Sequence, residues 1–323
     1  MNRATKFWLV TASVLFLIGG IVFAGGMSVL KWDFTKLSFN KYETNVHTVG
    51  EEYGGISIVT ETADVEFVIS NDSETSVVCY EQITGRHSVS VKDGVLVIDL
   101  ENTKKWYEYI GINFGTPKIT LTLPSGEYGD LKIKTSTGRV DIPSGIEFED
   151  VDITASTGAV TNRASASGEV KIKTSTGSIT LEDINAGSLH LSVSTGKITL
   201  DKIDCAGDVT VKVSTGKTVI TDTQCVNLTS NGSTGSMILT NVIASGRFSL
   251  ERSTGDVKFE KCDAAELHIE TDTGDVKGSL LSEKIFVTET DTGRIDVPKT
   301  TAGASARSVP IREILKLRLN KLQ

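Results

Sequence analysis

Asp272 and Asp291 each begin the tripeptide Asp-Thr-Gly, the signature of the catalytic aspartates of aspartic proteases. Those enzymes bring two such aspartates face to face so that the pair shares one proton. In this sequence the two aspartates lie one repeat apart, and each replaces a serine in a phrase that recurs along the chain. Their position favours a structural role, so we predict no protease active site.

Other catalytic arrangements are disfavoured by spacing as well. A glycosidase needs two carboxyl groups flanking one bond, whereas the acidic residues here are spread singly along the chain. His190 and His268 share one position of the repeat but lie four repeats apart, which is about 19 Å at one strand spacing per repeat. We therefore predict a protein that is not an enzyme, with no catalytic, cofactor-binding or metal-binding residues.

The cysteines do not form a recognisable metal motif. None of them belongs to the Cys-x-x-Cys pair that is typical of zinc sites. Cys205 and Cys225 lie one repeat apart, so we expect them to be neighbours. A disulfide between them and two free, half-buried thiols are both compatible with this spacing. The four cysteines are Cys79, Cys205, Cys225 and Cys262.

The phrase Ser-Thr-Gly or Asp-Thr-Gly recurs nine times between Thr135 and Gly293. Successive glycines are 19 or 20 residues apart, and a period held this tightly indicates a repeat architecture. Glycine suits a tight corner because φ is often positive there, and Ser, Thr and Asp side chains can bond the amides of a turn. The predicted corners are Gly138, Gly158, Gly177, Gly196, Gly216, Gly235, Gly255, Gly274 and Gly293.

Apolar and polar residues alternate on both sides of each corner. Counted from the glycine, the seventh residue before it is apolar in all nine repeats, and the second residue after it in eight. A period of two is typical of a strand with one buried face. Strands that pair in register with the next repeat predict an all-β fold, a single-stranded parallel β-helix (β-solenoid) with about 19–20 residues per coil.

Weaker coils precede the regular repeats. The alternation is already visible before residue 124, and the stretch 56–65 matches 269–276 with Ala63 at the place of the glycine. We therefore predict one solenoid and no second domain. The predicted organisation is a cytoplasmic N-terminus at 1–6, a transmembrane signal-anchor at 7–30, a juxtamembrane connector at 31–45, a β-solenoid at 46–300 (degenerate coils at 46–128, regular repeats at 129–300) and an aberrant tail at 301–323.

Residues 7–30 carry no charge and are flanked by Arg3, Lys6 and Lys31. At about 1.5 Å per residue they can cross a bilayer core of about 30 Å. A cleaved signal peptide is the alternative, although its apolar region is usually only about 7–15 residues long. We expect a single-pass anchor in the cell membrane, with residues 31–323 extracytoplasmic by the positive-inside rule.

Two exposed features are candidate contact surfaces. Trp106, Tyr107 and Tyr109 lie in an aromatic-rich interruption that could meet a membrane protein partner or pack over the solenoid. The outward positions of the repeats are basic early and acidic late, so the basic end could bind an anionic envelope polymer, although solvated charge that protects strand edges also explains them. The net charge of -8 gives no basic footprint for nucleic acid. The charged positions are Lys132, Lys134, Lys171, Lys173 and Lys212, then Glu251, Glu270 and Glu289.

The phrases at 135–138, 252–257, 271–276 and 290–294, behind one N-terminal membrane segment, resemble the bacterial putative-adhesin family of membrane-anchored β-helix proteins. The resemblance covers roughly residues 46–300. It implies a right-handed β-helix at the outer face of a Gram-positive-type membrane, and it brings no catalytic residues with it. Our hypothesis is an adhesin-like binding or scaffold module of the cell envelope. An accessory sensor of envelope stress that acts through a membrane partner is the alternative, and a carbohydrate-active enzyme is the third possibility.

The tail breaks the repeat. The next corner glycine is due at 312 or 313, where the chain has Arg312 and Glu313. One interpretation is a basic amphipathic helix that caps the last coil or touches lipid. The other is a shifted reading frame, because codons for residues 310–317 can be chosen that read Asp-Thr-Gly-Asp-Ile-Lys-Ile two bases later. That reading places a glycine at the due position.

Overall fold

The structure is a computed structural model that describes residues 2–34, 41–72, 74–103, 115–282, 284–288, 304–310 and 315–317. The chain forms two compact units. The first consists of Met1–Glu43, Gln82–Gly85 and Asn102–Gly115, and the second of Thr44–Glu81, Arg86–Glu101 and Thr116–Gln323.

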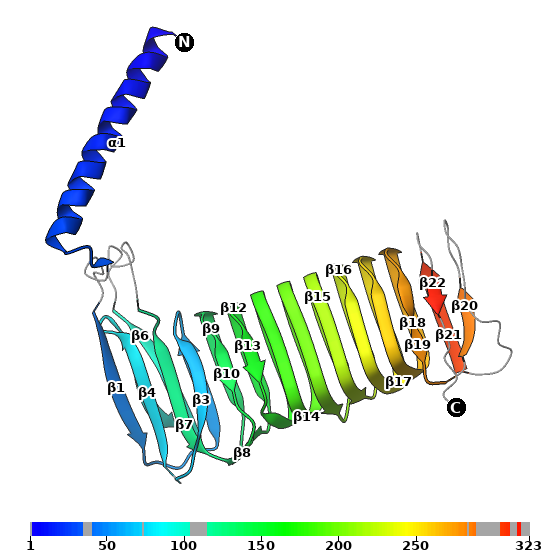
Figure 1. Ribbon diagram of the computed structural model, residues 1–323. Coiled ribbons are helices and arrows are strands. Elements are labelled where there is room, and N and C mark those ends of the chain that lie inside the picture. Colours follow the sequence, from blue (N-terminus) through cyan, green and yellow to red (C-terminus); the bar gives the residue numbers. More distant parts are fainter. Residues whose placement is uncertain are drawn as a thin grey trace. The chain divides into compact units, whose positions relative to one another are not determined.

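The first unit contains helix α1 (Arg3–Val29), shown in Figure 1. The Asn2 side chain caps this helix by accepting a hydrogen bond from the Thr5 N–H at 2.9 Å, which explains why the helix begins before the apolar stretch. Its 27 residues cover about 40 Å. In the described part of the chain, α1 is the helix long and apolar enough to cross a membrane, a property that a signal sequence shares.

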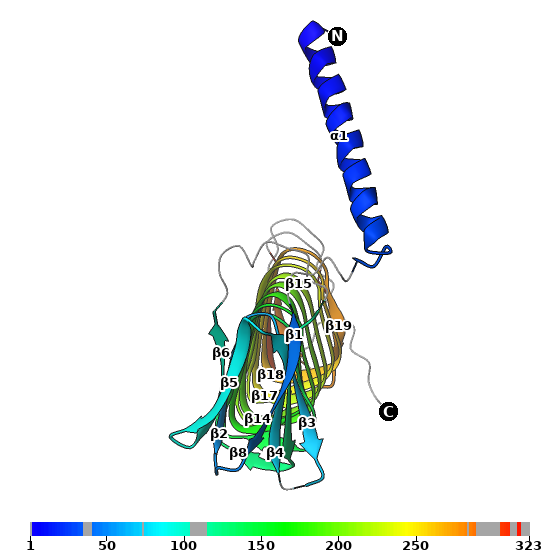
Figure 2. The same cartoon turned by 90° about the vertical axis from the view of Figure 1, so that its left-hand side faces the viewer.

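The second unit is a parallel β-solenoid whose coils stack along one direction (Figure 1). Seen along the stack, the coils lie over one another as flattened rings (Figure 2). Each strand pairs in register with the same strand one coil later, so that Leu131, Val151 and Val170 form one ladder. The predicted solenoid and its coil length are confirmed. The first regular strands are β8 (Gly126–Tyr128), β9 (Leu131–Thr137), β10 (Val140–Ile142), β11 (Ile146–Phe148), β12 (Val151–Thr157) and β13 (Val160–Asn162).

Later strands continue around the corners because the corner residues also pair with the next coil. Thr195, Gly196 and Lys197 of β14, for example, pair with Thr215, Gly216 and Lys217 of β15. A single strand therefore includes one or more whole turns of the solenoid. These strands are β14 (Ser165–Cys205), β15 (Val209–Cys225), β16 (Leu228–Thr234), β17 (Met237–Thr254), β18 (Val257–Thr273) and β19 (Val276–Leu280).

The segment before the regular repeats contains two layers stacked in parallel, β2 with β3 and β6 with β7, together with the antiparallel pairings of β4. Strand β2 pairs with β9, with Ile56 beside Leu131, and β3 pairs with β10, so residues 56–70 stack directly on a coil far along the chain. Strand β4 is antiparallel to β7. From the sequence we expected only degenerate coils in this segment and did not predict an antiparallel pairing. The strands are β1 (Tyr42–Val49), β2 (Gly55–Thr60), β3 (Asp64–Ser70), β4 (Thr75–Gln82), β5 (Gly85–Lys92), β6 (Val95–Asn102) and β7 (Lys118–Pro124).

The core is a column of aliphatic side chains inside the coils. In every described regular repeat, the seventh residue before and the second residue after the corner glycine are buried, as the alternation predicted. Few aromatic rings enter this column, and Phe148 and Phe248 are the largest fully buried side chains. The residues seven before the corner are Leu131, Val151, Val170, Leu189, Val209, Leu228, Phe248 and Leu267.

Glycine is required at the corners by backbone conformation and by close stacking. From Gly158 to Gly274 the seven corner glycines have φ between 128° and 149°, a region that residues with a Cβ avoid. A Cβ at any of them would also overlap the carbonyl oxygen of the corner glycine one coil earlier. The predicted positive φ does not extend to Gly138, which needs glycine because a Cβ there would overlap the Ala63 carbonyl. Gly293 lies outside the described residues.

The amides of corner glycines such as Gly158 and Gly255 bond main-chain oxygens rather than the predicted side chains. One residue after a corner glycine, the N–H groups of Arg139 and Asp275 donate to the Asp64 and Asp256 carboxylates. The Gly158 N–H donates to the Thr176 carbonyl at 3.0 Å, and the Gly255 N–H donates to the Thr273 carbonyl at 2.8 Å. The corner is therefore part of the ladder between coils, and the Ser/Thr-turn prediction is wrong for these amides.

The described parts of the tail are strands. Strand β21 (Ala304–Pro310) lies between β18 and β20 (Lys284–Thr288), with Ala306 beside both Leu267 and Phe286, and β22 (Leu315–Leu317) pairs with β19. The helical interpretation of the tail is therefore wrong for these residues. The shifted reading frame stays a prediction, which the nucleotide sequence of the gene tests.

Candidate functional site

Four of the predicted lysines form one exposed patch, which we call the basic stripe: Lys132 and Lys134 of β9, and Lys171 and Lys173 of β14. Within one strand the two lysine Cα atoms are about 6.6 Å apart, and the two strands are about 9.6 Å apart because β12 lies between them. The stripe therefore presents four ammonium groups over an area that an extended anionic chain can follow.

Two carboxylates lie close to the basic stripe. Asp152 occupies the strand between Lys132 and Lys171, and Asp130 pairs with Lys132 at 3.1 Å between exposed groups. A shallow depression of about 420 Å³ lies at the β9 end of the stripe, where Lys132, Lys134, Asp152 and Thr154 are among its lining residues. The depression is open, and its lining includes Ile58, Val59 and Ile133 beside the charged residues. It therefore suits an extended chain better than an enclosed small molecule.

The remaining charged positions do not extend this patch. Lys212 lies further along the solenoid, with Ser192 and Asn231 as its neighbours on adjacent coils. Glu251 and Glu270 are adjacent on the late coils, so that end of the face is acidic, as predicted. Glu289 lies outside the described residues, and so do Trp106, Tyr107 and Tyr109, the predicted aromatic contact surface.

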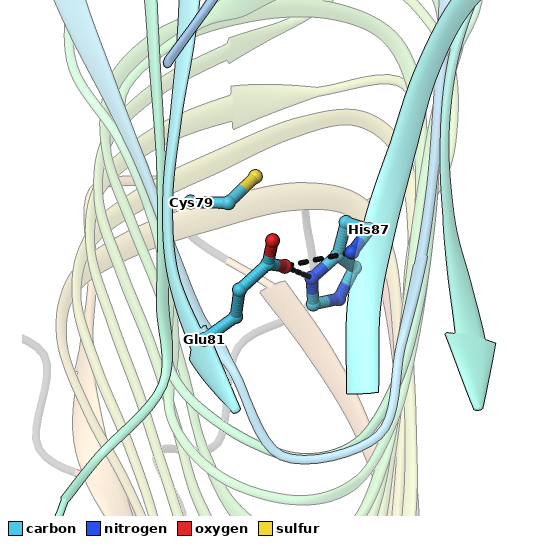
Figure 3. Close-up of side chains that lie close together, drawn as sticks. All are labelled: Cys79, Glu81 and His87. Atoms are coloured by element: carbon cyan, nitrogen blue, oxygen red, sulfur yellow. Dashed lines mark hydrogen bonds and ion pairs between the residues drawn. The ribbon is translucent and has the colours of Figure 1, made fainter. Parts of the chain in front are cut away.

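A second cluster lies inside the first coils, where three potential metal ligands converge (Figure 3). Cys79 and Glu81 project from one face of β4, and His87 projects toward them from β5. All three residues are at least 95% buried, and their ligand atoms lie within 4.8 Å of one another. The two strands are antiparallel, with Gln82 opposite Gly85, so a two-residue turn brings His87 back to Glu81.

Hydrogen bonds fix the carboxylate and the imidazole of this cluster. Glu81 Oε2 accepts from the His87 N–H at 2.7 Å and contacts His87 Nδ1 at 2.6 Å, while Glu81 Oε1 accepts from Asn45 Nδ2 at 2.8 Å. His87 Nε2 lies 3.0 Å from Thr60 Oγ1. Burial and the Glu81 carboxylate raise the pKa of the Cys79 thiol to about 12, so the thiol is protonated in the absence of a cation. The cluster can serve as a rigid polar network or as a site for a metal cation.

Sequence reasoning missed this cluster because it searched for Cys-x-x-Cys pairs. The signal was a Cys-x-Glu pair, which places both side chains on one face of a strand, followed by the two-residue turn at Ile83 and Thr84 and then a histidine. The two cysteines that lie one repeat apart are not part of this cluster. Cys205 and Cys225 lie on neighbouring coils, and both are buried free thiols.

The chain was compared with protein families, curated proteins and solved structures. Residues 53–212 match the family model described as Toastrack DUF4097. No curated protein matches the chain. One similar solved structure is a putative adhesin from Parabacteroides distasonis ATCC 8503, with 14% identity, 84% of this chain and 98% of that chain covered, and a TM-score of 0.42. A second is a putative adhesin from Bacteroides fragilis NCTC 9343, with 16% identity, coverage of 85% of this chain and 96% of that chain, and a TM-score of 0.36. A third is a putative lipid binding protein from Parabacteroides distasonis ATCC 8503, with 16% identity, coverage of 85% of this chain and 97% of that chain, and a TM-score of 0.38. At these identities and TM-scores the structures carry no argument about function.

Proposed function

From the premise that residues 53–212 belong to the Toastrack DUF4097 family, which confirms the predicted family resemblance, we propose that the chain is a membrane-anchored, extracytoplasmic β-solenoid. It works as an adhesin-like binding or scaffold module of the cell envelope rather than as an enzyme. Its ligand is an extended anionic polymer that lies along the basic stripe.

The observation that carries the proposal is the regular spacing of exposed lysines on a rigid face. In-register pairing holds Lys132, Lys134, Lys171 and Lys173 at fixed separations, so the site loses little backbone entropy on binding. Exposed ion pairs contribute only about 0.2–1 kcal/mol each. A polymer that engages several lysines at once gains from all of them, which favours an extended ligand over a single anion.

Helix α1 supports the anchored location. It is long enough to span the bilayer core, and Arg3 and Lys6 on its short N-terminal side favour a cytoplasmic N-terminus. A solenoid held by its first residues at the outer face would meet envelope polymers there.

Binding of the full-length chain in detergent to an immobilised poly(glycerol phosphate) tests the proposal. An uncharged dextran of similar length is the control surface. We expect binding to the polyanion alone, and we expect it to weaken as the salt concentration rises because exposed charges are screened. Equal binding to both surfaces, or none to either, would reject the polymer as the ligand.

A further inference from the structure

We propose that Cys79, Glu81 and His87 form a binding site for a zinc ion in the interior of the first coils. The site is independent of the proposed polymer binding, because its residues face the interior of the solenoid and the basic stripe faces outward. It stands on three observations: the ligand types, their separation and the hydrogen bonds that hold two of them.

The distances suit a tetrahedral ion. Zinc binds cysteine sulfur at about 2.3 Å and histidine or carboxylate atoms at about 2.0–2.2 Å, so ligand atoms lie roughly 3.3–3.8 Å apart around it. The three ligand atoms here already lie within 4.8 Å of one another. The contact of 2.6 Å between Glu81 Oε2 and His87 Nδ1 has to lengthen by about 1 Å to admit the ion. A water molecule completes four-coordination.

The charges balance in the bound state. The ion displaces the thiol proton of Cys79, which leaves to solvent, and the proton that His87 Nδ1 shares with Glu81 Oε2 leaves that contact for Nε2 or for solvent. One dication, one thiolate, one carboxylate and a neutral imidazole sum to zero. A neutral centre avoids the cost of an unpaired charge in a buried site.

Neighbouring residues are placed to orient the ligands. Asn45 Nδ2 donates to the Glu81 oxygen that faces away from His87, and Thr60 Oγ1 lies at hydrogen-bond distance from His87 Nε2. With Nδ1 on the metal, Nε2 carries the remaining proton and donates it to Thr60. Partners of this kind fix the ring orientation and typically account for about 10–100-fold in metal affinity.

Zinc is the ion that this ligand set fits best. Calcium and magnesium bind through oxygen atoms alone, whereas a thiolate and an imidazole together with one carboxylate suit zinc. Cys79 also separates the two explanations of the cluster. The hydrogen bonds of a purely structural network run through Asn45, Thr60, Glu81 and His87, so such a network does not need the thiol.

Cobalt titration of the metal-free full-length chain in detergent tests the site. Co²⁺ takes the place of zinc, and thiolate ligation produces a charge-transfer band in the near ultraviolet. We expect that band to saturate at one Co²⁺ per chain and to disappear when Zn²⁺ is added. We also expect Zn²⁺, but not Mg²⁺ at the same concentration, to raise the midpoint of thermal unfolding.

Two cysteine variants distinguish the site from adventitious binding. Cys79→Ser should lose the band and weaken Zn²⁺ binding by about 100-fold or more, whereas Cys262→Ser, which changes another fully buried thiol, should bind as the wild type does. Thr60→Val keeps all three ligands and should weaken binding by about 10–100-fold. Absence of the band in the folded wild-type chain, or an unchanged band in Cys79→Ser, would show that the cluster is a hydrogen-bonded network only.

Discussion

Gly196 shows at the scale of one residue why the corner of each regular coil admits a single residue type. Its φ is 149°, and a Cβ there would overlap the Gly177 carbonyl oxygen. A side chain at this position would therefore meet both an unfavourable φ and a steric overlap. Pairing with the neighbouring coil keeps the backbone from moving to relieve either. A backbone in this region costs roughly 1–3 kcal/mol for a residue with a side chain.

Gly196→Ala should therefore destabilise the solenoid by at least about 2 kcal/mol, measured as a lower midpoint of thermal unfolding. Two glycines separate the causes. Gly94 has φ of 74° with open space around it, and Gly54 has open space without a positive φ. Gly94→Ala should cost about 1 kcal/mol, and Gly54→Ala should stay within about 0.5 kcal/mol. Equal effects at Gly196 and Gly54 would contradict the steric account.

Buried thiols should lower the folding stability as the pH rises into the alkaline range. Burial raises the pKa of Cys225 to about 12 and that of Cys262 to about 11. A thiol whose pKa is higher in the folded state stabilises the fold fully below its unfolded pKa. That contribution is lost as the pH rises toward the folded value, because the unfolded chain releases its proton first.

Between pH 8 and pH 10 each of these two thiols should therefore cost about 1 kcal/mol of folding stability. Replacing both, in Cys225→Ala/Cys262→Ala, should flatten the fall in the thermal midpoint over this range relative to the wild type. The two curves differ only by the thiol contribution, whatever constant offset the substitutions add. Parallel curves would show that neither thiol changes its pKa on folding.

Packing between coils is the next scale, and Arg252 illustrates it. Its guanidinium is buried and lies against Gly232 of the coil before, where the absent side chain leaves room. Nη1 donates to the Glu251 carbonyl at 2.7 Å, and Nη2 donates to Ser230 Oγ at 2.9 Å. Burial lowers the pKa of Arg252 to about 10, which marks the charge as costly. The Arg252 side chain fills the space beside Gly232, but its guanidinium loses its hydration when it is buried.

Arg252→Met should keep that space filled and change stability by less than about 1 kcal/mol, because removal of the buried charge offsets the lost hydrogen bonds. Arg252→Ala should cost about 2–4 kcal/mol, because it leaves a cavity beside Gly232. Urea unfolding of the two variants checks the difference. If both variants lose the same stability, the hydrogen bonds of Arg252 rather than its volume hold the coils together.

The sequence predicted those elements whose signal repeats in every coil. Corner glycines and period-two alternation recur with the same local meaning, so the regular coils and their buried columns followed from pattern alone. The pairing of β2 with β9 joins residues that are about 75 positions apart in the sequence, and no local sequence pattern predicts it. The same holds for the Cys79–Glu81–His87 cluster, which depends on a turn between two antiparallel strands and not on a known metal spacing.

At the scale of the whole molecule, the location of the protein depends on whether α1 is a retained membrane anchor or a cleaved signal sequence. A retained anchor should keep the full-length chain in the membrane fraction during alkaline extraction, whereas a cleaved signal would release a shorter soluble chain. Leu17→Arg places a charge at the middle of α1, at a cost of about 2.5–3.5 kcal/mol, and should lower the membrane-bound fraction. Val29→Arg, at the end of the helix, is the matched control, because a long side chain there can reach the interface.

Affinity for a polyanion, measured on stripe and control variants of the full-length chain, tests the central claim most directly. The stripe variant carries Lys→Gln at 132, 134, 171 and 173, and the control carries Lys→Gln at 197, 202, 217 and 261, which lowers the net charge equally. The stripe variant should bind poly(glycerol phosphate) at least about tenfold more weakly than the wild type at low salt, and the control should bind within about twofold of it. Equal losses in both variants would contradict a defined binding face and leave only general charge attraction.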